Sequence, residues 1–260
     1  MAHNGGLVLR YAVGSDPGLR RSNNEDAVYA SSRLLAVADG MGGHAHGEVA
    51  SGTTASVLAE LDANLPAELG DIDLLATLAG AVAEAARRLI DLISQDAGLT
   101  GMGTTLTALL WNGREFGVVH LGDSRGYLLR DDTLHQITRD HTMIQALVDS
   151  GRLTPEQAAE HPRRSVLVRA LQADTEVEPD LFLHQVAAGD RYLLCSDGLT
   201  DVVPVEAVGE ALAEIEDPDA AVRRLIELAN EGGGPDNISC VLADVGEASR
   251  GKGTWFSRRR

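Results

Sequence analysis

Four aspartates share a sequence context that could bind a cation. Asp39 lies in "AVADG", Asp123 in "VHLGDSRG", Asp197 in "LLCSDGL" and Asp236 in "GGPDN". Three of them follow apolar runs typical of strands, the fourth precedes one, and glycine nearby lets backbone and solvent approach closely. A single Asp-Gly is usually only a turn. Four such aspartates at strand ends can converge at one end of a sheet, where their repulsion is costly unless a cation balances it.

The chemistry that these residues favour is hydrolysis at a pair of hard divalent ions. The ligands are all oxygen, with no Cys or His at zinc spacing, which suits Mg²⁺ or Mn²⁺. Two such ions about 3.5–4 Å apart can hold and acidify one water. We therefore expect Asp39 to end its strand and bridge the two ions. Gly40 has no side chain, so its carbonyl is free to act as a ligand.

Charged residues in "LRRSNNEDAVY" form a second polar group, ahead of the first aspartate. Arg20 and Arg21 are followed by Glu25 and Asp26. An arginine near a dinuclear site suggests a bidentate clamp on a phosphate group. The alternative is a solvated loop with two surface arginines, which these residues alone leave open.

Three competing motifs fail on their surroundings. Residues 122–126 match the G-x-S-x-G nucleophile elbow, but a strand-like run follows instead of the required helix. "GEASRGKG" resembles a phosphate-binding loop, but Gly253 occupies the Ser/Thr position. A cysteine-based phosphatase would need an arginine six residues after its nucleophile, where the two cysteines are followed by Asp201 and Gly246.

Charge and composition exclude several other classes. The chain of 260 residues carries a formal net charge of −17, which argues against a nucleic-acid-binding protein. It contains no apolar run long enough to span a bilayer and no signal-peptide pattern at its start. Cys195 and Cys240 lie in apolar runs and are expected to be buried free thiols. We expect a cytoplasmic protein.

The hydrophobic pattern predicts an α+β domain. Two long helices are expected over 48–61 and 74–93, with Asp71 and Asp73 as possible caps. Hairpins are expected to turn at Asn112-Gly113 and at Asp131-Asp132. Further strands are predicted at 7–13, at 34–38, at "RYLLC" and at "ISCVLADV". Further helices are predicted at 141–150, at 205–212 and at 220–229, and one more is expected to begin at the capping box 154–157. The helical insert over 140–172 is either a packing excursion or a lid beside a site.

Seven blocks in order carry a family resemblance: "RSNNEDAVY", "VADGMGGHAHGEVAS", "GMGTTLTALL", "HLGDSRGYLLRDDTLHQIT", "DHTMIQALVDSGRLTPEQA", "YLLCSDGLTD" and "GGGPDNISCVLADV". They resemble the metal-dependent, type-2C (PPM) protein serine/threonine phosphatases, above all the actinobacterial branch that reverses Hanks-type kinases. The resemblance covers about residues 7–245. It implies two packed antiparallel β-sheets flanked by helices on both sides, with the insert over 140–172 as a mobile flap.

The resemblance also assigns the site residues. Asp39 would bridge two Mn²⁺ or Mg²⁺ ions and, with Asp197, Asp236 and Arg21, form the catalytic set. The carbonyl of Gly40 would bind one ion, Asp197 and Asp236 would complete the ligands of the first, and Asp123 with Asp197 would hold a third. Glu25 and Asp26 would lie near the second ion through water, Arg21 would bind the phosphate, and Ser165 would lie on the far arm of the flap.

One position departs from the animal members of the family. They carry a histidine after the Asp-Gly, proposed as the general acid, whereas this chain has Met41. A water on the third ion is the preferred proton donor, and His44 is the second candidate.

The predicted function is hydrolysis of phosphoserine and phosphothreonine in proteins, including Ser/Thr kinases, by in-line attack of a hydroxide that bridges two ions. A pseudophosphatase and a hydrolase of small phosphoesters are the alternatives. We expect a monomeric catalytic domain over residues 1–245 and a basic, disordered tail over 246–260, with membrane tethering only if the natural protein continues beyond residue 260.

Overall fold

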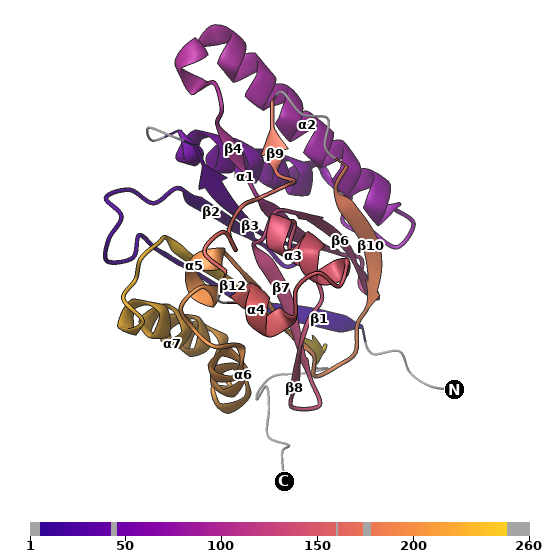
Figure 1. Cartoon of the computed structure of the whole chain (residues 1–260). Helices are drawn as coiled ribbons and strands as arrows, with labels where there is room; N and C mark the ends of the chain where they lie inside the picture. Colours follow the sequence, from indigo (N-terminus) through magenta and orange to yellow (C-terminus); the bar gives the residue numbers. More distant parts are fainter. Residues whose placement is uncertain (1–5, 43–45, 160, 174–177, 249–260) are drawn as a thin grey trace.

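The computed structural model describes residues 6–42, 46–159, 161–173 and 178–248. Two antiparallel sheets pack face to face, and helices cover the outer face of each (Figure 1). The fold class predicted from the sequence is therefore confirmed.

The first sheet has five strands in the order β1-β12-β11-β7-β8, so the two ends of the domain pair with each other. Its long pair joins the first strand to the last along their whole length, with Leu7 opposite Glu247 and Asp16 opposite Ile238. The strands are β1 (Leu7–Asp16), β7 (Arg125–Arg130), β8 (Thr133–Gln136), β11 (Arg191–Cys195) and β12 (Ile238–Glu247).

The second sheet has seven strands in the order β10-β6-β5-β3-β4-β9, with β2 paired to β3. They are β2 (Asp26–Ala30), β3 (Leu34–Met41), β4 (Gly103–Thr104), β5 (Leu106–Trp111), β6 (Glu115–Leu121), β9 (Leu171–Gln172) and β10 (Asp180–Gln185).

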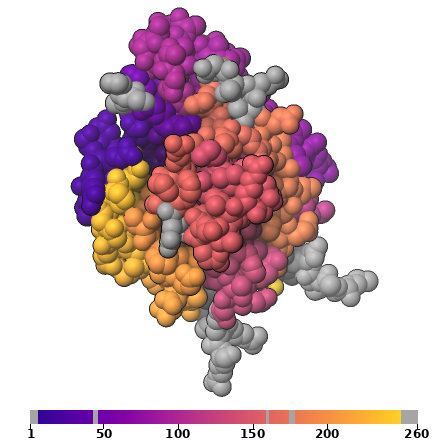
Figure 2. Space-filling view, in the orientation of Figure 1, coloured from indigo at the N-terminus to yellow at the C-terminus, as the bar shows by residue number. Residues whose placement is uncertain are grey.

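Helices α1 (Gly47–Asn64) and α2 (Leu74–Gln95) cover the second sheet, followed by the short 3-10 helix η1 (Ala97–Leu99). Helices α5 (Asp197–Thr200), α6 (Val205–Glu214) and α7 (Pro218–Glu231) cover the first. The insert over residues 140–172, here named the flap segment, carries α3 (Met143–Asp149) and α4 (Pro155–Ala159). It lies in the middle of the face shown in Figure 2.

Strand alternation explains the layers. Side chains of successive strand residues point to opposite faces, and in β3 Leu34 and Ala36 pack against the helices while Leu35 and Val37 pack against the other sheet. Both faces of this strand are buried, so all four residues are apolar and almost fully buried. The strand therefore holds its C-terminal end in a fixed place between the sheets.

Local signals account for the element boundaries. The Asp131-Asp132 hairpin has positive φ at both residues (51° and 59°), as a two-residue turn of this type requires. The Asp73 side chain accepts from the Ala76 N–H and caps α2. The predicted capping box is also present, because Thr154 N donates to Gln157 Oε1 and Gln157 N donates to Thr154 Oγ1.

Two expectations about strand ends were wrong. Strand β3 does not stop at Asp39 but runs on to Met41, because Gly40 and Met41 pair with β4. Asp197 does not end a strand either, since β11 stops at Cys195 and Asp197 begins α5. Asp39 and Asp197 still lie close to strand ends, each two residues from the last residue of β3 or β11.

Both cysteines are buried and free, as expected. Among the described residues, no helix is long and apolar enough to cross a bilayer.

Candidate active site

Hydrogen bonds from Thr104 and Thr105, where β4 passes into β5, fix the backbone of Asp39 in β3. Asp39 N donates to Thr105 Oγ1 (2.9 Å), and Asp39 O accepts from Thr105 N and Thr104 Oγ1, both at 2.9 Å. Thr104 and Thr105 are almost fully buried, so these bonds are shielded from water. The Asp39 side chain therefore extends from a rigid base.

Glycine brings Asp197 and Asp236 together. A Cβ on Gly198 would lie 1.9 Å from the Asn237 carbonyl oxygen and 3.5 Å from the Asp236 Cβ. Only glycine lets the start of α5 pack so closely against the loop that precedes β12. Two carboxylates almost 40 positions apart in the sequence thus lie beside each other.

Strand register places Asp26 beside Asp39. The two residues are opposite one another in the β2–β3 pair. Asp26 Oδ2 accepts from Ser196 Oγ (2.8 Å), whereas Asp26 Oδ1 is buried with no hydrogen-bond partner. A buried carboxylate oxygen without a partner is costly, and a cation would satisfy it.

Asp123 enters the same group from the β6–β7 loop. Gly122 has φ +102°, which glycine adopts freely. Ser124 Oγ shares a hydrogen bond with Thr105 Oγ1 (2.7 Å), and Ser124 O accepts from Thr107 Oγ1 (2.7 Å). Ser124 is thus buried and engaged, and a strand follows it, so its rejection as a hydrolase nucleophile is confirmed.

The carboxylates perturb one another. Burial, followed by the charges of Asp197, Asp26 and Asp123, raises the pKa of Asp39 well above its usual range. Burial and then Asp201 and Asp236 raise the pKa of Asp197 to about 7. These are the shifts expected where several carboxylates crowd into one poorly solvated place.

Asp123 and Asp26 behave in the same way. Burial and Asp197 raise the pKa of Asp123 to about 8. The pKa of Asp26 is also raised, chiefly by burial. The predicted convergence of Asp39, Asp123, Asp197 and Asp236 is thus visible as mutual charge repulsion, and Asp26 joins them.

The donor set fits divalent cations. After burial, the charge of Asp197 is the largest influence that raises the pKa of Asp39, and a divalent ion between the two carboxylates would remove this repulsion. Within the described parts of the chain, no three His, Cys, Asp or Glu side chains are placed to hold an ion, so binding would require the carboxylates to reorient.

Gly40 and Glu25 border this group at the start of α1. A Cβ on Gly40 would lie 2.3 Å from Gly47 O and 2.4 Å from Glu25 O, so no side chain fits there. A point at the missing Cβ of Gly47 lies 2.4 Å from Glu25 Oε2 and 2.7 Å from Gly40 O. The Glu25 carboxylate and the backbone of Gly40 therefore lie close together beside Gly47, at the start of α1.

Arg21 lies at the rim of the site. Its Nη2 donates to Asp236 Oδ2 (2.6 Å), and about half of its side chain is exposed. Arg21 can therefore contact both the Asp236 carboxylate and a ligand in solvent.

Ser165 is exposed in a turn of the flap segment and shows no contact with the carboxylates. Met41 ends β3, and His44 lies outside the described residues.

Asn237 was overlooked in the sequence, where "GGGPDN" indicated only a loop. Its Oδ1 accepts from Glu25 N (2.8 Å), and its Nδ2 donates to the carbonyls of Pro17 (3.0 Å) and Asn23 (2.8 Å). It thereby ties the loop that carries Arg21 to the residue after Asp236. No local pattern signals such a role, because its partners are more than 200 residues away.

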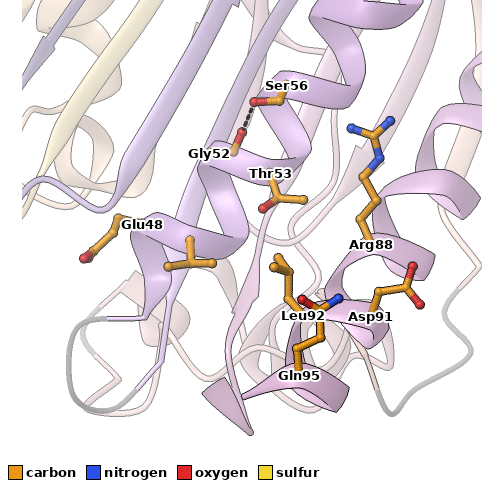
Figure 3. A pocket seen from close by; sticks show the side chains of 9 residues that line it. Glu48, Gly52, Thr53, Ser56, Arg88, Asp91, Leu92 and Gln95 are labelled. Carbon is orange, nitrogen blue, oxygen red and sulfur yellow. Dashed lines mark hydrogen bonds between the residues drawn. The ribbon is translucent and has the colours of Figure 1, made fainter. Parts of the chain in front are cut away.

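A cavity of about 560 Å³ lies between α1 and α2 (Figure 3). Its lining includes Glu48, Thr53, Arg88 and Leu92. Arg88 is already paired with Glu60 and Glu84. None of the five aspartates described above lines this cavity.

Comparisons with known proteins identify the family of the chain. The profile described as "Protein phosphatase 2C" matches residues 20–243. The serine/threonine protein phosphatase PstP of Mycobacterium tuberculosis (strain ATCC 25618 / H37Rv) is 56% identical over 239 residues, which are 92% of this chain and 45% of PstP. The chain thus spans about half the length of that curated relative. The serine/threonine phosphatase stp of Listeria innocua is 34% identical over 92% of this chain and 96% of its own length.

Solved structures resemble the whole fold. A crystal structure of the M. tuberculosis phosphatase PstP/Ppp has a TM-score of 0.87 and 55% identity, and the match covers 91% of this chain and 98% of that one. The catalytic domain of PstP in complex with two manganese ions has a TM-score of 0.86 and 54% identity, over 93% of this chain and 100% of that one.

Proposed function

The chain belongs to the protein phosphatase 2C family, and from that premise we propose that it is a metal-dependent phosphatase of phosphoserine and phosphothreonine in proteins. The observation that carries the proposal is the group of four largely buried aspartates, from β2, β3, α5 and the β6–β7 loop, whose pKa values are raised by burial and by neighbouring carboxylates. The manganese ions of the related PstP catalytic domain support the choice of cation.

The ligands that we propose follow from the positions above. Asp39 would contact two ions, with Asp197 and Asp236 on one side and the Gly40 carbonyl on the other. Glu25 and Asp26 would act on that other side through water. Asp123, with Asp197, would hold a third, weaker ion. Bound ions would neutralise the phosphate and lower the pKa of a water held between them.

The residues of the chain would orient the substrate. Arg21 can leave Asp236 once an ion neutralises that carboxylate, and its planar guanidinium then matches two phosphate oxygens. Because Arg21 is half exposed and anchored through the loop that Asn237 ties down, it can receive a phosphate from solvent without refolding the site. Met41 carries no proton to donate, so protonation of the leaving alkoxide must come from another group.

We also propose the finer assignments that follow from the family. The substrates would be phosphoproteins, among them Ser/Thr kinases, acted on by a monomer in the cytoplasm. The catalytic domain would end just after residue 247 and not at 245, because Gly246 and Glu247 still pair with β1, and the residues that follow would form a tail. The net charge of −17 supports protein substrates over nucleic acid.

Phosphate release tests the function directly. A phosphothreonine peptide, a phosphoserine peptide and a sugar phosphate are compared with Mn²⁺, with Mg²⁺ and with EDTA. We expect metal-dependent release that is fastest from the phosphopeptides. Faster release from the sugar phosphate would indicate a hydrolase of small phosphoesters. No release from any substrate, with the peptides still bound, would indicate a pseudophosphatase.

A further inference from the structure

His141 lies at the root of the flap segment, against the loop that carries Asp123. Only 3% of the residue is exposed. Its backbone N donates to Gly122 O (2.7 Å), and its Nδ1 accepts from Gly122 N (3.1 Å). One histidine therefore satisfies both backbone groups of the residue that precedes Asp123.

Gly122 needs such support. It has φ +102°, and a Cβ there would lie 2.5 Å from the Thr105 side chain. The peptide is thus held in a close turn whose buried N–H would otherwise lack a partner, at a cost typical of a buried unsatisfied donor. The direction of the chain as it enters Asp123 follows from this turn.

A carboxylate fixes the tautomer of His141. Because Nδ1 accepts the Gly122 N–H, the ring proton must lie on Nε2, which donates to Asp180 Oδ2 (3.0 Å). Arg169 Nη1 donates to the other oxygen of Asp180 (2.8 Å). Burial lowers the pKa of His141, which agrees with a neutral ring. The order Gly122–His141–Asp180–Arg169 is a continuous chain of hydrogen bonds.

The same histidine ties the two arms of the flap segment together. His141 O accepts from Val168 N (2.8 Å), Thr142 pairs with Leu167, and Met143 N donates to Val166 O (2.8 Å). These contacts form a short ladder between the outgoing and returning arms. A shift of either arm would therefore move His141.

We propose that His141 is a positioning residue that couples Asp123 to the root of the flap segment. It acts through Gly122 and touches neither substrate nor ion. The proposal rests on the proposed function, because it gives Asp123 a task at the metal site.

Three variants test this coupling. His141→Ala removes the acceptor for the Gly122 N–H, whereas His141→Asn keeps an oxygen near the place of Nδ1. His135→Ala is the matched control, because His135 is exposed in β8. Hydrogen exchange of the Gly122 amide is measured without metal, and the Mn²⁺ dependence of phosphate release is measured in parallel.

We expect His141→Ala to speed exchange at Gly122 by about 10- to 100-fold, as loss of one buried hydrogen bond implies. The Mn²⁺ concentration for half-maximal activity should rise several-fold, with a smaller effect on the KM for a phosphopeptide. His141→Asn should recover part of both changes, and His135→Ala should match the wild type. Unchanged exchange at Gly122 together with an unchanged Mn²⁺ dependence in His141→Ala would overturn the proposal.

Two further measurements decide the question if the variant does not fold or if the wild type is inactive. If His141→Ala fails to fold, nitrogen NMR of the wild-type imidazole decides, because a proton on Nε2 supports the proposal and a proton on Nδ1 contradicts it. If the wild type releases no phosphate with Mn²⁺, the proposed function fails, while the exchange of Gly122 still shows whether His141 positions the Asp123 loop.

Discussion

The guanidinium of Arg21 donates a hydrogen bond to the carboxylate of Asp236, with Nη2 2.6 Å from Oδ2. The proposed phosphate ligand is thus paired with a proposed metal ligand 215 positions away in the sequence. Both side chains are partly exposed, so the pair adds little stability. An ion that neutralises Asp236 would leave Arg21 free for the phosphate.

Replacement of Arg21 should therefore weaken substrate binding and leave the metal site intact. We expect Arg21→Ala to lower kcat/KM for a phosphopeptide by about 10- to 100-fold, the loss of a charge-assisted contact. Its affinity for Mn²⁺, measured by calorimetry, should change little. The neighbouring Arg20→Ala is the control and should stay within about 2-fold of the wild type. Equal effects of the two substitutions would contradict this assignment.

A methyl group at Gly198 should separate Asp197 from Asp236. The added Cβ would lie 1.9 Å from the Asn237 carbonyl oxygen, so α5 must move. We expect Gly198→Ala to reduce the free energy of unfolding by about 1–3 kcal/mol and activity by about 10-fold or more. Gly80→Ala is the control, since nothing lies within 4 Å of its Cβ in α2, and it should gain about 0.5–1 kcal/mol. Wild-type activity in Gly198→Ala would refute the close contact.

Asn237 should matter for both stability and substrate binding. Its amide joins three backbone groups, so Asn237→Ala should cost about 2–4 kcal/mol in unfolding free energy. Asn237→Asp keeps the acceptor for Glu25 N but cannot donate to the two carbonyls, and it should also raise the KM. Urea unfolding and steady-state kinetics measure the two effects. A neutral Asn237→Asp would show that the two donated hydrogen bonds are dispensable.

His120 should make stability depend on pH. Burial lowers its pKa to about 4, whereas an unfolded histidine titrates near 6.5. Between these values the unfolded state binds the extra proton, so the free energy of unfolding falls as pH falls from about 6.5 to 4 and then levels off. The full loss is about 3 kcal/mol.

Urea unfolding at pH 7.5 and pH 5 measures this term. His120→Gln should show a difference between the two pH values about 2 kcal/mol smaller than the wild type does. The exposed His135→Gln should behave as the wild type. An identical pH dependence in all three proteins would show that His120 is not held neutral.

Sequence pattern predicted the α+β class and most elements because burial and periodicity are local properties, whereas the packing of two sheets was expected from the family resemblance. The long helices, the Asn112-Gly113 hairpin and the cap of Asp73 all follow from nearby residues. Strand β10 was not predicted, because "DLFLHQ" forms a half-exposed edge strand with weak alternation. The end of strand β3 was predicted too early in the sequence, because its last two residues pair with Thr104 and Gly103 of the distant strand β4.

The site was predictable in its residue types but not in its supports. The four aspartates had a visible context in the sequence. Asn237 and His141 had none, because an amide or imidazole that binds distant backbone groups leaves no periodic or spacing signal. Their positions depend on which loops meet once both sheets have packed.

Calorimetric titration of Mn²⁺ into the wild type and into Asp39→Asn, with phosphopeptide hydrolysis measured on the same samples, tests the central claim most directly. The account predicts that the wild type binds at least two ions and is active only when they are bound, and that Asp39→Asn loses ion binding and activity together while keeping its fold. Metal-independent hydrolysis by the wild type, or full activity in Asp39→Asn, would contradict it.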